Sequence, residues 1–228
     1  MEKYKKYKFK TDIEKICKKH NDKVCIFDEI NNKKISYKDI LENIFHIRAY
    51  LQKKKITNND CIISCIENSA INFQFFLSLM YYGYTYSPLT PDTTIKELNK
   101  ALKISSNVFV LISDGTNQSL VDYLKKKKIK YTNINQVKFN SNNRIKKIKA
   151  CNQAGKLVLN SSGTTGEPKK ILIEIDKLWT NGKLFSNLYT FINKESIFLN
   201  FLPMSYLGGL FNLGLIPISS GSSIVITK

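Results

Sequence analysis

The hydrophobic positions of this chain recur with two different periods, and the two periods alternate along the sequence. Short apolar runs typical of strands cover residues 23–28, 61–66, 84–89 and 107–113. Between them, apolar residues three and four positions apart, such as those from Tyr37 to Leu51, predict helices. Because strands alternate with helices, the pattern predicts an α/β fold whose mostly parallel sheet is flanked by helices.

Polar residues at the ends of these segments predict where the helices begin and end. Ser36 with Asp39, and Thr94 with Glu97, have the spacing of capping boxes. Gly83 follows an apolar helical segment that begins after Ser69, at the position where glycine ends many helices.

The same pattern continues through the second half of the chain. A polar stretch over residues 140–155 indicates a long loop, and strands are expected at 156–160 and 170–175. Asp176 is then expected to cap a helix that runs to about Phe191. A strand over 196–203, a glycine-containing helix over 206–219 and a final strand over 222–228 complete the prediction.

Charge and arginine content bear on whether the chain binds nucleic acid. The formal net charge is +18, which raises the possibility of nucleic-acid binding, but only Arg48 and Arg144 among the 36 basic residues are arginines. Arginine makes most of the forked contacts to guanine and phosphate, so a diffuse, solvated lysine surface is the better interpretation.

Other residue types limit the compartment and the chemistry. The 5 cysteines have neither metal nor redox spacing, which favours a reducing, cytoplasmic location, and no apolar run is long enough to cross a membrane. With only His20 and His46 available, the sequence predicts no metal site and no histidine-based triad.

The segment "SSGTTGEPKK", residues 161–170, carries the most specific chemistry. Its glycines let backbone N–H groups turn toward an anion, while its serines, threonines and a lysine add further donors. Such a set suits a polyphosphate, and the strands on both sides exclude the P-loop, which opens a helix. The predicted phosphate-binding residues are Ser161, Ser162, Gly163, Thr164, Thr165, Gly166 and Lys169.

This segment resembles the phosphate loop of the AMP-forming, adenylate-forming enzymes, a superfamily of acyl-CoA synthetases, luciferases and adenylation domains of nonribosomal peptide synthetases. The family pattern is roughly T-S-G-T-T-G-x-P-K-G, so Lys170 replaces a glycine. Further segments agree in order: "ISYKDI" at 35–40, "LMYYGYTYSPLTPD" at 79–92, "LPMSYLGGL" at 202–210 and "SSGSSIVI" at 219–226.

The resemblance implies a fold and a reaction. It implies the N-terminal portion of an AMP-binding domain, with layered sheets flanked by helices, an incomplete second sheet and no C-terminal lid domain. Residues 56–200 would form the subdomain that carries the phosphate loop, and residues 1–55 and 201–228 would contribute to the incomplete one. The final strand, 222–228, would lie at an edge and leave apolar faces uncovered, so the chain would aggregate or recruit a partner.

The resemblance also implies substrates and partners. A ligase of this family joins a carboxylic acid to ATP, usually with Mg²⁺, and passes the acyl group to coenzyme A or a carrier protein. Tyr206 and Gly208 would line the acyl side of the pocket, and Tyr206 replaces a histidine that many members carry. The adenine- and ribose-binding segments and the catalytic lysine of the family have no counterpart here, so a second chain would have to supply them.

Three interpretations therefore remain open. The chain is the N-terminal part of a carboxylate-activating ligase that is inactive without the rest. Alternatively, it is a degenerate remnant that binds nucleotide without catalysis. The least favoured interpretation is a basic scaffold or nucleic-acid-binding protein, which a steep loss of oligonucleotide binding with salt would support.

Overall fold

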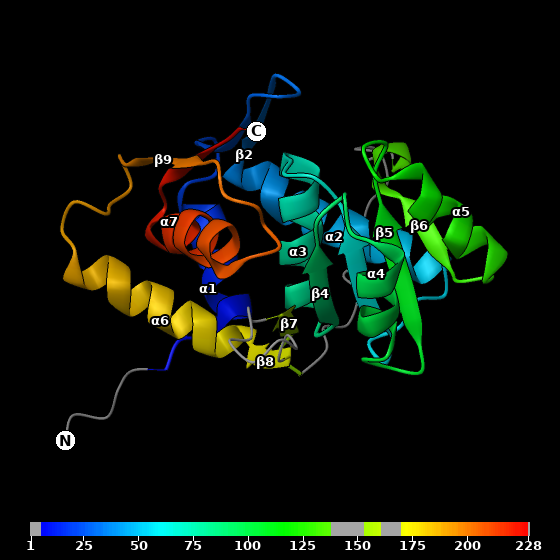
Figure 1. Ribbon diagram of the computed structural model, residues 1–228. Coiled ribbons are helices and arrows are strands. Elements are labelled where there is room, and N and C mark those ends of the chain that lie inside the picture. The colour runs from blue at the N-terminus through cyan, green and yellow to red at the C-terminus, as the bar shows by residue number, and fades with distance from the viewer. Residues whose placement is uncertain (1–5, 138–152, 161–169, 228) are drawn as a thin grey trace, which may run out of the picture.

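The computed structural model describes residues 6–137, 153–160 and 170–227. Within these residues the strands form two sheets, which we name sheet A and sheet B (Figure 1). The strand order of sheet A is β2 (Lys33–Ser36), β1 (Val24–Asp28), β10 (Ser223–Ile226) and β9 (Ile197–Asn200). The strand order of sheet B is β6 (Tyr131–Asn133), β5 (Val108–Ile112), β3 (Cys61–Cys65), β4 (Thr85–Leu89), β7 (Lys156–Asn160) and β8 (Lys170–Glu174).

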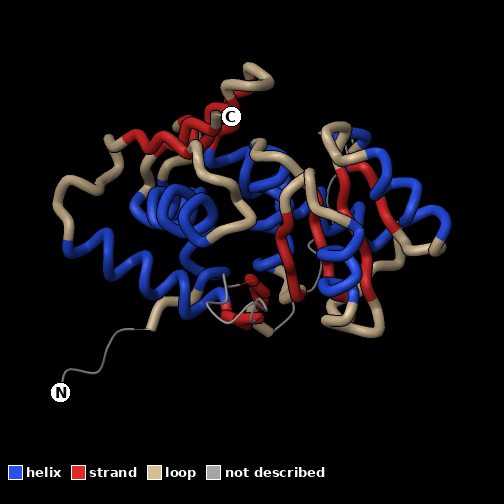
Figure 2. The backbone as a smooth tube through the Cα atoms, viewed as in Figure 1, coloured by secondary structure: helices blue, strands red, loops and turns tan. Residues whose placement is uncertain are grey.

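Helices connect and separate the two sheets (Figure 2). The helices are α1 (Phe9–Lys19), α2 (Tyr37–Lys53), α3 (Ala70–Tyr81), α4 (Ile95–Leu102), α5 (Gln118–Lys126), the 3₁₀ turn η1 (Ile134–Gln136), α6 (Ile175–Leu188), the π-helical segment η2 (Gly208–Leu215) and α7 (Ile216–Ser220). Helix α3 is buried along almost its whole length and contacts strands of both sheets. The predicted α/β layering is therefore confirmed.

The core has two parts, one on each face of sheet B. The larger part joins both sheets through α2 and α3 and includes Phe73, Phe76 and Tyr86. The smaller part lies between sheet B and helices α4 and α5 and includes Ile63 and Leu120. Strand β3 is buried at every position, as expected for a parallel strand covered on both faces.

The predicted helix ends agree with the structure at three places. Ser36 with Asp39, and Thr94 with Glu97, form capping boxes at the starts of α2 and α4. Gly83 follows α3 with a φ of 78°, a left-handed conformation that glycine adopts without steric cost.

The prediction that Asp176 caps a helix is wrong. The N-cap of helix α6 is Glu174, two residues earlier, and it makes no side-chain capping bond. Asp176 lies in the first turn, and its carboxylate instead accepts hydrogen bonds from the backbone N–H of Phe9 at 3.0 Å and from Lys8 Nζ at 2.8 Å. The helix also ends at Leu188 rather than near Phe191.

The prediction that the final strand is an edge is also wrong. Strand β10 lies inside sheet A and pairs in parallel with β1 on one side and β9 on the other. The edges of sheet A are β2 and β9. The division into subdomains at residues 55 and 200 stays a prediction, and sheet A itself takes its strands from 24–36 and 197–226.

Candidate functional site

The predicted phosphate loop connects two paired strands. Strands β7 and β8 are antiparallel, with Asn160 opposite Lys170 at one end and Lys156 opposite Glu174 at the other. The two strands predicted on either side of the loop are therefore present. The predicted phosphate-binding residues, Ser161, Ser162, Gly163, Thr164, Thr165, Gly166 and Lys169, lie outside the described residues.

The position of β7 determines where this connection starts. Strand β7 runs parallel to β4, with Lys156 beside Thr85 and Leu157 beside Tyr86. The carboxyl end of β7 therefore lies at the same edge of sheet B as the carboxyl ends of β3, β4 and β5. Ligands of open α/β sheets bind at this edge, which makes it the candidate site.

A group of polar side chains occupies the same edge, after β3 and β5. Ser113 Oγ donates a hydrogen bond to the Glu67 carboxylate, and Thr116 Oγ1 donates to the carbonyl of Cys65 at 2.6 Å. A Cβ atom at Gly115 would lie 3.1 Å from Glu67 Oε2, so the loop after β5 packs closely against this carboxylate. These contacts hold the carboxyl ends of β3 and β5 together.

Asn68 connects this edge to the segment that carries Tyr206. Its Nδ2 donates to the carbonyl of Leu202 at 2.8 Å, and its Oδ1 accepts from the backbone N–H of Met204 at 2.9 Å. Glu67 and Asn68 were not among the predicted site residues, although both lie within three residues of the end of the buried strand β3, where site residues of parallel sheets are common. That position was the signal that could have found them.

Tyr206 and Gly208, the two predicted pocket residues, lie beside the turn at Leu202–Met204. The Tyr206 side chain is 58% exposed, and its backbone N–H donates to the carbonyl of Pro203 at 3.1 Å. A Cβ at Gly208 would lie 2.8 Å from Leu202 Cδ1. Gly209 is more constrained, because a Cβ there would lie 2.3 Å from the Leu202 carbonyl oxygen.

Two polar atoms in this region are buried without a partner among the described residues. They are Oδ1 of Asn200, at the carboxyl end of β9, and Oγ of Ser205. The Nδ2 atom of Asn200 donates to the carbonyl of Gly209 at 2.9 Å, so Asn200 orients the start of η2.

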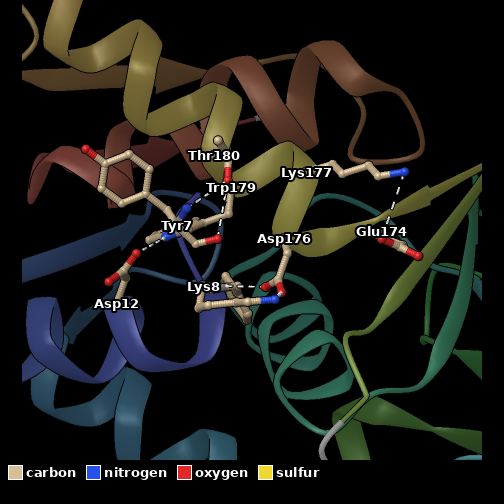
Figure 3. Close-up of polar contacts among 9 residues, drawn as sticks. Tyr7, Lys8, Asp12, Glu174, Asp176, Lys177, Trp179 and Thr180 are labelled. Carbon is tan, nitrogen blue, oxygen red and sulfur yellow. Dashed lines mark hydrogen bonds and ion pairs between the residues drawn. The ribbon is translucent and has the colours of Figure 1, made fainter. Parts of the chain in front are cut away.

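A cavity of about 780 Å³ lies at the opposite end of the β7–β8 hairpin. Its lining includes Lys156 and Glu174, which pair at the end of the hairpin opposite to Asn160 and Lys170. Figure 3 shows the polar contacts on its wall, where Tyr7 and Lys8 meet α6: the backbone N–H of Tyr7 donates to Thr180 Oγ1 at 3.1 Å. We therefore do not assign this cavity to the candidate site.

The buried thiols are poor nucleophiles. Burial raises the pKa of Cys65 to about 12 and that of Cys61 to about 11, so both are protonated near neutral pH. Burial, followed by the charge of Glu14, also raises the pKa of Cys17 to about 12. The cysteines of the described residues, Cys17, Cys25, Cys61 and Cys65, are all unpaired.

Residues 6–137, 153–160 and 170–227 form neither a candidate metal centre nor a candidate membrane span. No group of three or more His, Cys, Asp or Glu side chains there could hold a metal ion. No helix there is long and apolar enough to cross a membrane.

The sequence matches the family model of the AMP-binding enzymes over residues 13–228. The chain belongs to this family. No curated protein matches the sequence significantly.

Solved structures of adenylate-forming proteins share the fold at low sequence identity. The chain is similar to McyG A-PCP complexed with phenylalanyl-adenylate, with a TM-score of 0.79, 18% identity, and coverage of 98% of this chain and 42% of McyG. It is similar to ATP-bound MatB from Rhodopseudomonas palustris, with a TM-score of 0.75, 17% identity, and coverage of 95% and 44%. The third is the N-terminal subdomain of Klebsiella oxytoca NpsA in complex with 3-hydroxyanthranilyl-AMSN, with a TM-score of 0.72, 17% identity, and coverage of 95% and 52%.

These coverages show how much of the fold the chain spans. It is matched almost along its full length, and it spans about half the length of the solved structures it matches. Its architecture matches part of the N-terminal subdomain of the adenylation fold, because it covers 52% of the NpsA subdomain structure.

Proposed function

We propose that this chain supplies the triphosphate-binding half of an ATP-dependent carboxylate-activating ligase. The observation that carries the proposal is a loop rich in hydroxyls and glycine, closed by Lys169, between the paired strands β7 and β8 of an AMP-binding family member. ATP-bound MatB and the phenylalanyl-adenylate complex of McyG have the same fold, which supports this substrate class.

The loop residues would bind the β- and γ-phosphates of ATP. Ser161, Ser162, Thr164 and Thr165 would donate hydroxyl hydrogen bonds, while Gly163 and Gly166 would turn backbone N–H groups toward the phosphate oxygens. Lys169 would neutralise charge as pyrophosphate forms. In the reaction, a carboxylate oxygen attacks the α-phosphorus, the bond between the α-phosphorus and the bridging oxygen breaks, and pyrophosphate leaves with its electron pair.

Tyr206 and Gly208 would lie on the acyl side of this site. The exposed Tyr206 ring can stack on or hydrogen-bond to a bound acid. Asn68 would hold their segment against the edge of sheet B through its bonds to Leu202 and Met204. Positioning of this kind contributes strongly to catalysis in phosphoryl-type substitutions.

Mg²⁺ would neutralise phosphate charge in such a reaction, as it does in other phosphoryl transfers. The described residues contain no cluster of side chains that could hold a metal ion.

The acceptor of the acyl group would be a thiol, either of coenzyme A or of a carrier protein. We expect no pyrophosphate release from residues 1–228 alone, because they match only about half of the adenylation fold. A reducing, cytoplasmic location fits the unpaired cysteines.

Two neighbouring lysines provide the test of the phosphate site. Lys169→Ala should weaken binding of a non-hydrolysable ATP analogue, measured by isothermal titration calorimetry, by about tenfold or more, because it removes a charge-assisted contact. Inorganic tripolyphosphate is a second probe that presents the phosphates without the base and should show the same loss.

Lys170→Ala is the matched control. Lys170 is the first residue of β8, its Nζ donates to the carbonyl of Lys100 at 2.9 Å, and it occupies the position where the family pattern has glycine. It carries the same charge one residue away, so its loss should leave the affinity within about twofold if the contact is specific. Equal losses for the two variants would mean diffuse attraction by lysines and would contradict the proposal.

A further inference from the structure

The cavity at the end of the β7–β8 hairpin has the size of a site for a small organic molecule. Its volume is about 780 Å³, and the ligand pockets of proteins are typically about 300–1,000 Å³. Its lining comes from the segment before α1, from the hairpin end and from one side of α6. The connection between Asn160 and Lys170, which carries the candidate phosphate loop, is at the other end of the same hairpin. The proposed function therefore makes no use of this cavity.

Hydrogen bonds fix one wall of the cavity, where the segment before α1 lies against α6 (Figure 3). The backbone N–H of Tyr7 donates to Thr180 Oγ1 at 3.1 Å, and the Thr180 hydroxyl donates to the carbonyl of Tyr7 at 3.3 Å. Two residues further along, the Asp176 carboxylate accepts from the backbone N–H of Phe9 at 3.0 Å. This wall is therefore held in place by the protein itself.

The opposite wall, at the hairpin end, is fixed by close packing. A Cβ at Gly155 would lie 2.5 Å from the Cα of Met80, so the chain before β7 lies directly against α3. The backbone N–H of Lys156 donates to the carbonyl of Tyr84, and that of Ile175 donates to the carbonyl of Gly155, both at 2.9 Å. A cavity between two fixed walls is pre-formed, as ligand pockets usually are.

The charged side chains of the lining leave positive charge uncompensated. They are Lys6, Lys8, Lys156, Lys177, Glu174 and Asp176. Both carboxylates are already paired, Asp176 with Lys8 at 2.8 Å and Glu174 with Lys177 at 4.0 Å. Lys6 and Lys156 form no ion pair with any residue in the described ranges. The cavity therefore attracts anions.

The lining between these charges is largely apolar. Tyr7, Ala154 and Leu184 contribute carbon surface and are half-buried. The aliphatic stems of the lysines extend this surface. A small polyanion would leave the apolar wall unused, and a neutral apolar molecule would leave the two lysines without a counter-charge. The lining is thus complementary to a molecule that has both an anionic head and an apolar body.

We propose that this cavity is a binding site for an amphiphilic organic anion of the medium-chain carboxylate type. Lys156 and Lys6 offset the charge of the head, and Leu184 packs against the body. Because Lys156 begins β7 and Glu174 ends β8, the ligand lies against both strands of the hairpin. The site is separate from Tyr206 and from the candidate phosphate loop.

Isothermal titration calorimetry with three probes tests which chemistry the cavity recognises. Octanamide has the apolar body of octanoate without its charge, so octanoate should bind at least about fivefold more tightly. Acetate has the charge without the body and should bind at least about tenfold more weakly than octanoate. No binding of octanoate, or equal affinities for octanoate and octanamide, would overturn the proposal.

Two pairs of variants locate the binding site. Lys156→Gln should weaken octanoate binding by about fivefold and leave octanamide binding unchanged, since it removes only charge. Lys170→Gln makes the same change at the other end of the hairpin and should leave the octanoate affinity within about twofold. Leu184→Asn should weaken both probes by about fivefold, whereas Leu188→Asn, at a leucine that is 77% exposed, should change neither. Equal losses within either pair would overturn the proposal.

A crystal soaked with 8-bromooctanoate gives a test that does not depend on the variants. The anomalous signal of bromine should lie in the cavity, between Leu184 of α6 and Ala154 before β7. A bromine signal beside Tyr206 instead would contradict a separate site. The tripolyphosphate affinity of the candidate phosphate loop does not involve this cavity, so the two proposals can fail separately.

Discussion

Asn68 Oδ1 accepts a hydrogen bond from the backbone N–H of Met204 at 2.9 Å, across 136 positions of sequence. The same side chain donates to the carbonyl of Leu202 at 2.8 Å. One amide thus joins the carboxyl edge of sheet B to the turn that precedes Tyr206 and η2.

Asn68→Ala should loosen this turn. It removes two partly buried hydrogen bonds and should lower the free energy of unfolding by about 1–3 kcal/mol. Hydrogen exchange should show faster exchange of the Met204 amide, while the strands of sheet B keep their protection. Asn59→Ala, at an exposed asparagine, is the control and should change stability by less than about 0.5 kcal/mol. Unchanged exchange at Met204 would show that Asn68 does not hold the turn.

Alanine substitutions at Gly209 and at Gly182 should change the stability of the protein in opposite directions. A Cβ at Gly209 would lie 2.3 Å from the Leu202 carbonyl oxygen and 2.6 Å from that of Pro203, so Gly209→Ala should cost about 3 kcal/mol. A Cβ at Gly182, inside α6, would have its nearest contact at 3.5 Å, which is ordinary packing. Gly182→Ala should therefore stabilise by about 0.5–1 kcal/mol through helix propensity. The measurement is the free energy of unfolding of both variants, by heat or denaturant. Equal changes for Gly209→Ala and Gly182→Ala would contradict the close packing described around η2.

The contact of α1 with α6 can be followed through Trp179, the single tryptophan of the sequence (Figure 3). It is fully buried, donates from Nε1 to Asp12 Oδ2 at 3.2 Å, and meets the Phe9 ring edge-on at 5.1 Å. Asp176→Ala removes the acceptor for the Phe9 N–H, so it should shift the tryptophan emission to the red and cost about 1–3 kcal/mol.

Lys8→Ala is the control for that substitution. It removes only the ion pair with Asp176, in which the Lys8 side chain is 70% exposed, so it should cost less than about 1 kcal/mol and leave the emission unchanged. If both variants behaved alike, the backbone hydrogen bond of Phe9 would not be what anchors α1.

Stability should fall as the solution is acidified below about pH 6.5, in part through His20. Burial, and then the charges of Lys19, Lys23 and further lysines, lowers the pKa of His20 from its ordinary value of 6.5. The unfolded chain therefore binds the proton at a higher pH than the folded chain. This penalty is absent above the unfolded pKa and grows as the pH falls below it.

His20→Gln should make the dependence on pH shallower over this range. The measurement is the free energy of unfolding by denaturant at about pH 7.5 and about pH 5.5, values on either side of the ordinary histidine pKa. Parallel losses in the wild type and the variant would show that His20 does not contribute.

Local signals predicted local structure well. Capping boxes need only residues three positions apart, so Ser36 with Asp39 and Thr94 with Glu97 could be read from the sequence. Asp176 has the same appearance as a cap, but a distant N–H, that of Phe9, binds its carboxylate, and no local pattern shows this.

The pairing of strands that are far apart in the sequence could not be predicted from local patterns. The final strand has no feature that distinguishes an edge from the centre of a sheet, and its place between β1 and β9 depends on contacts to residues far away in the sequence. The candidate phosphate loop could be predicted because its chemistry is contiguous. Glu67 and Asn68 act through residues 113 and 202–204, so they became visible only in the fold.

The most direct test of the central claim is the structure of crystals soaked with a non-hydrolysable ATP analogue. The account predicts triphosphate density at the connection between β7 and β8, with the Lys169 ammonium against the phosphate oxygens. Density for the analogue elsewhere, such as in the cavity lined by Lys156 and Lys177, with that connection vacant, would contradict it.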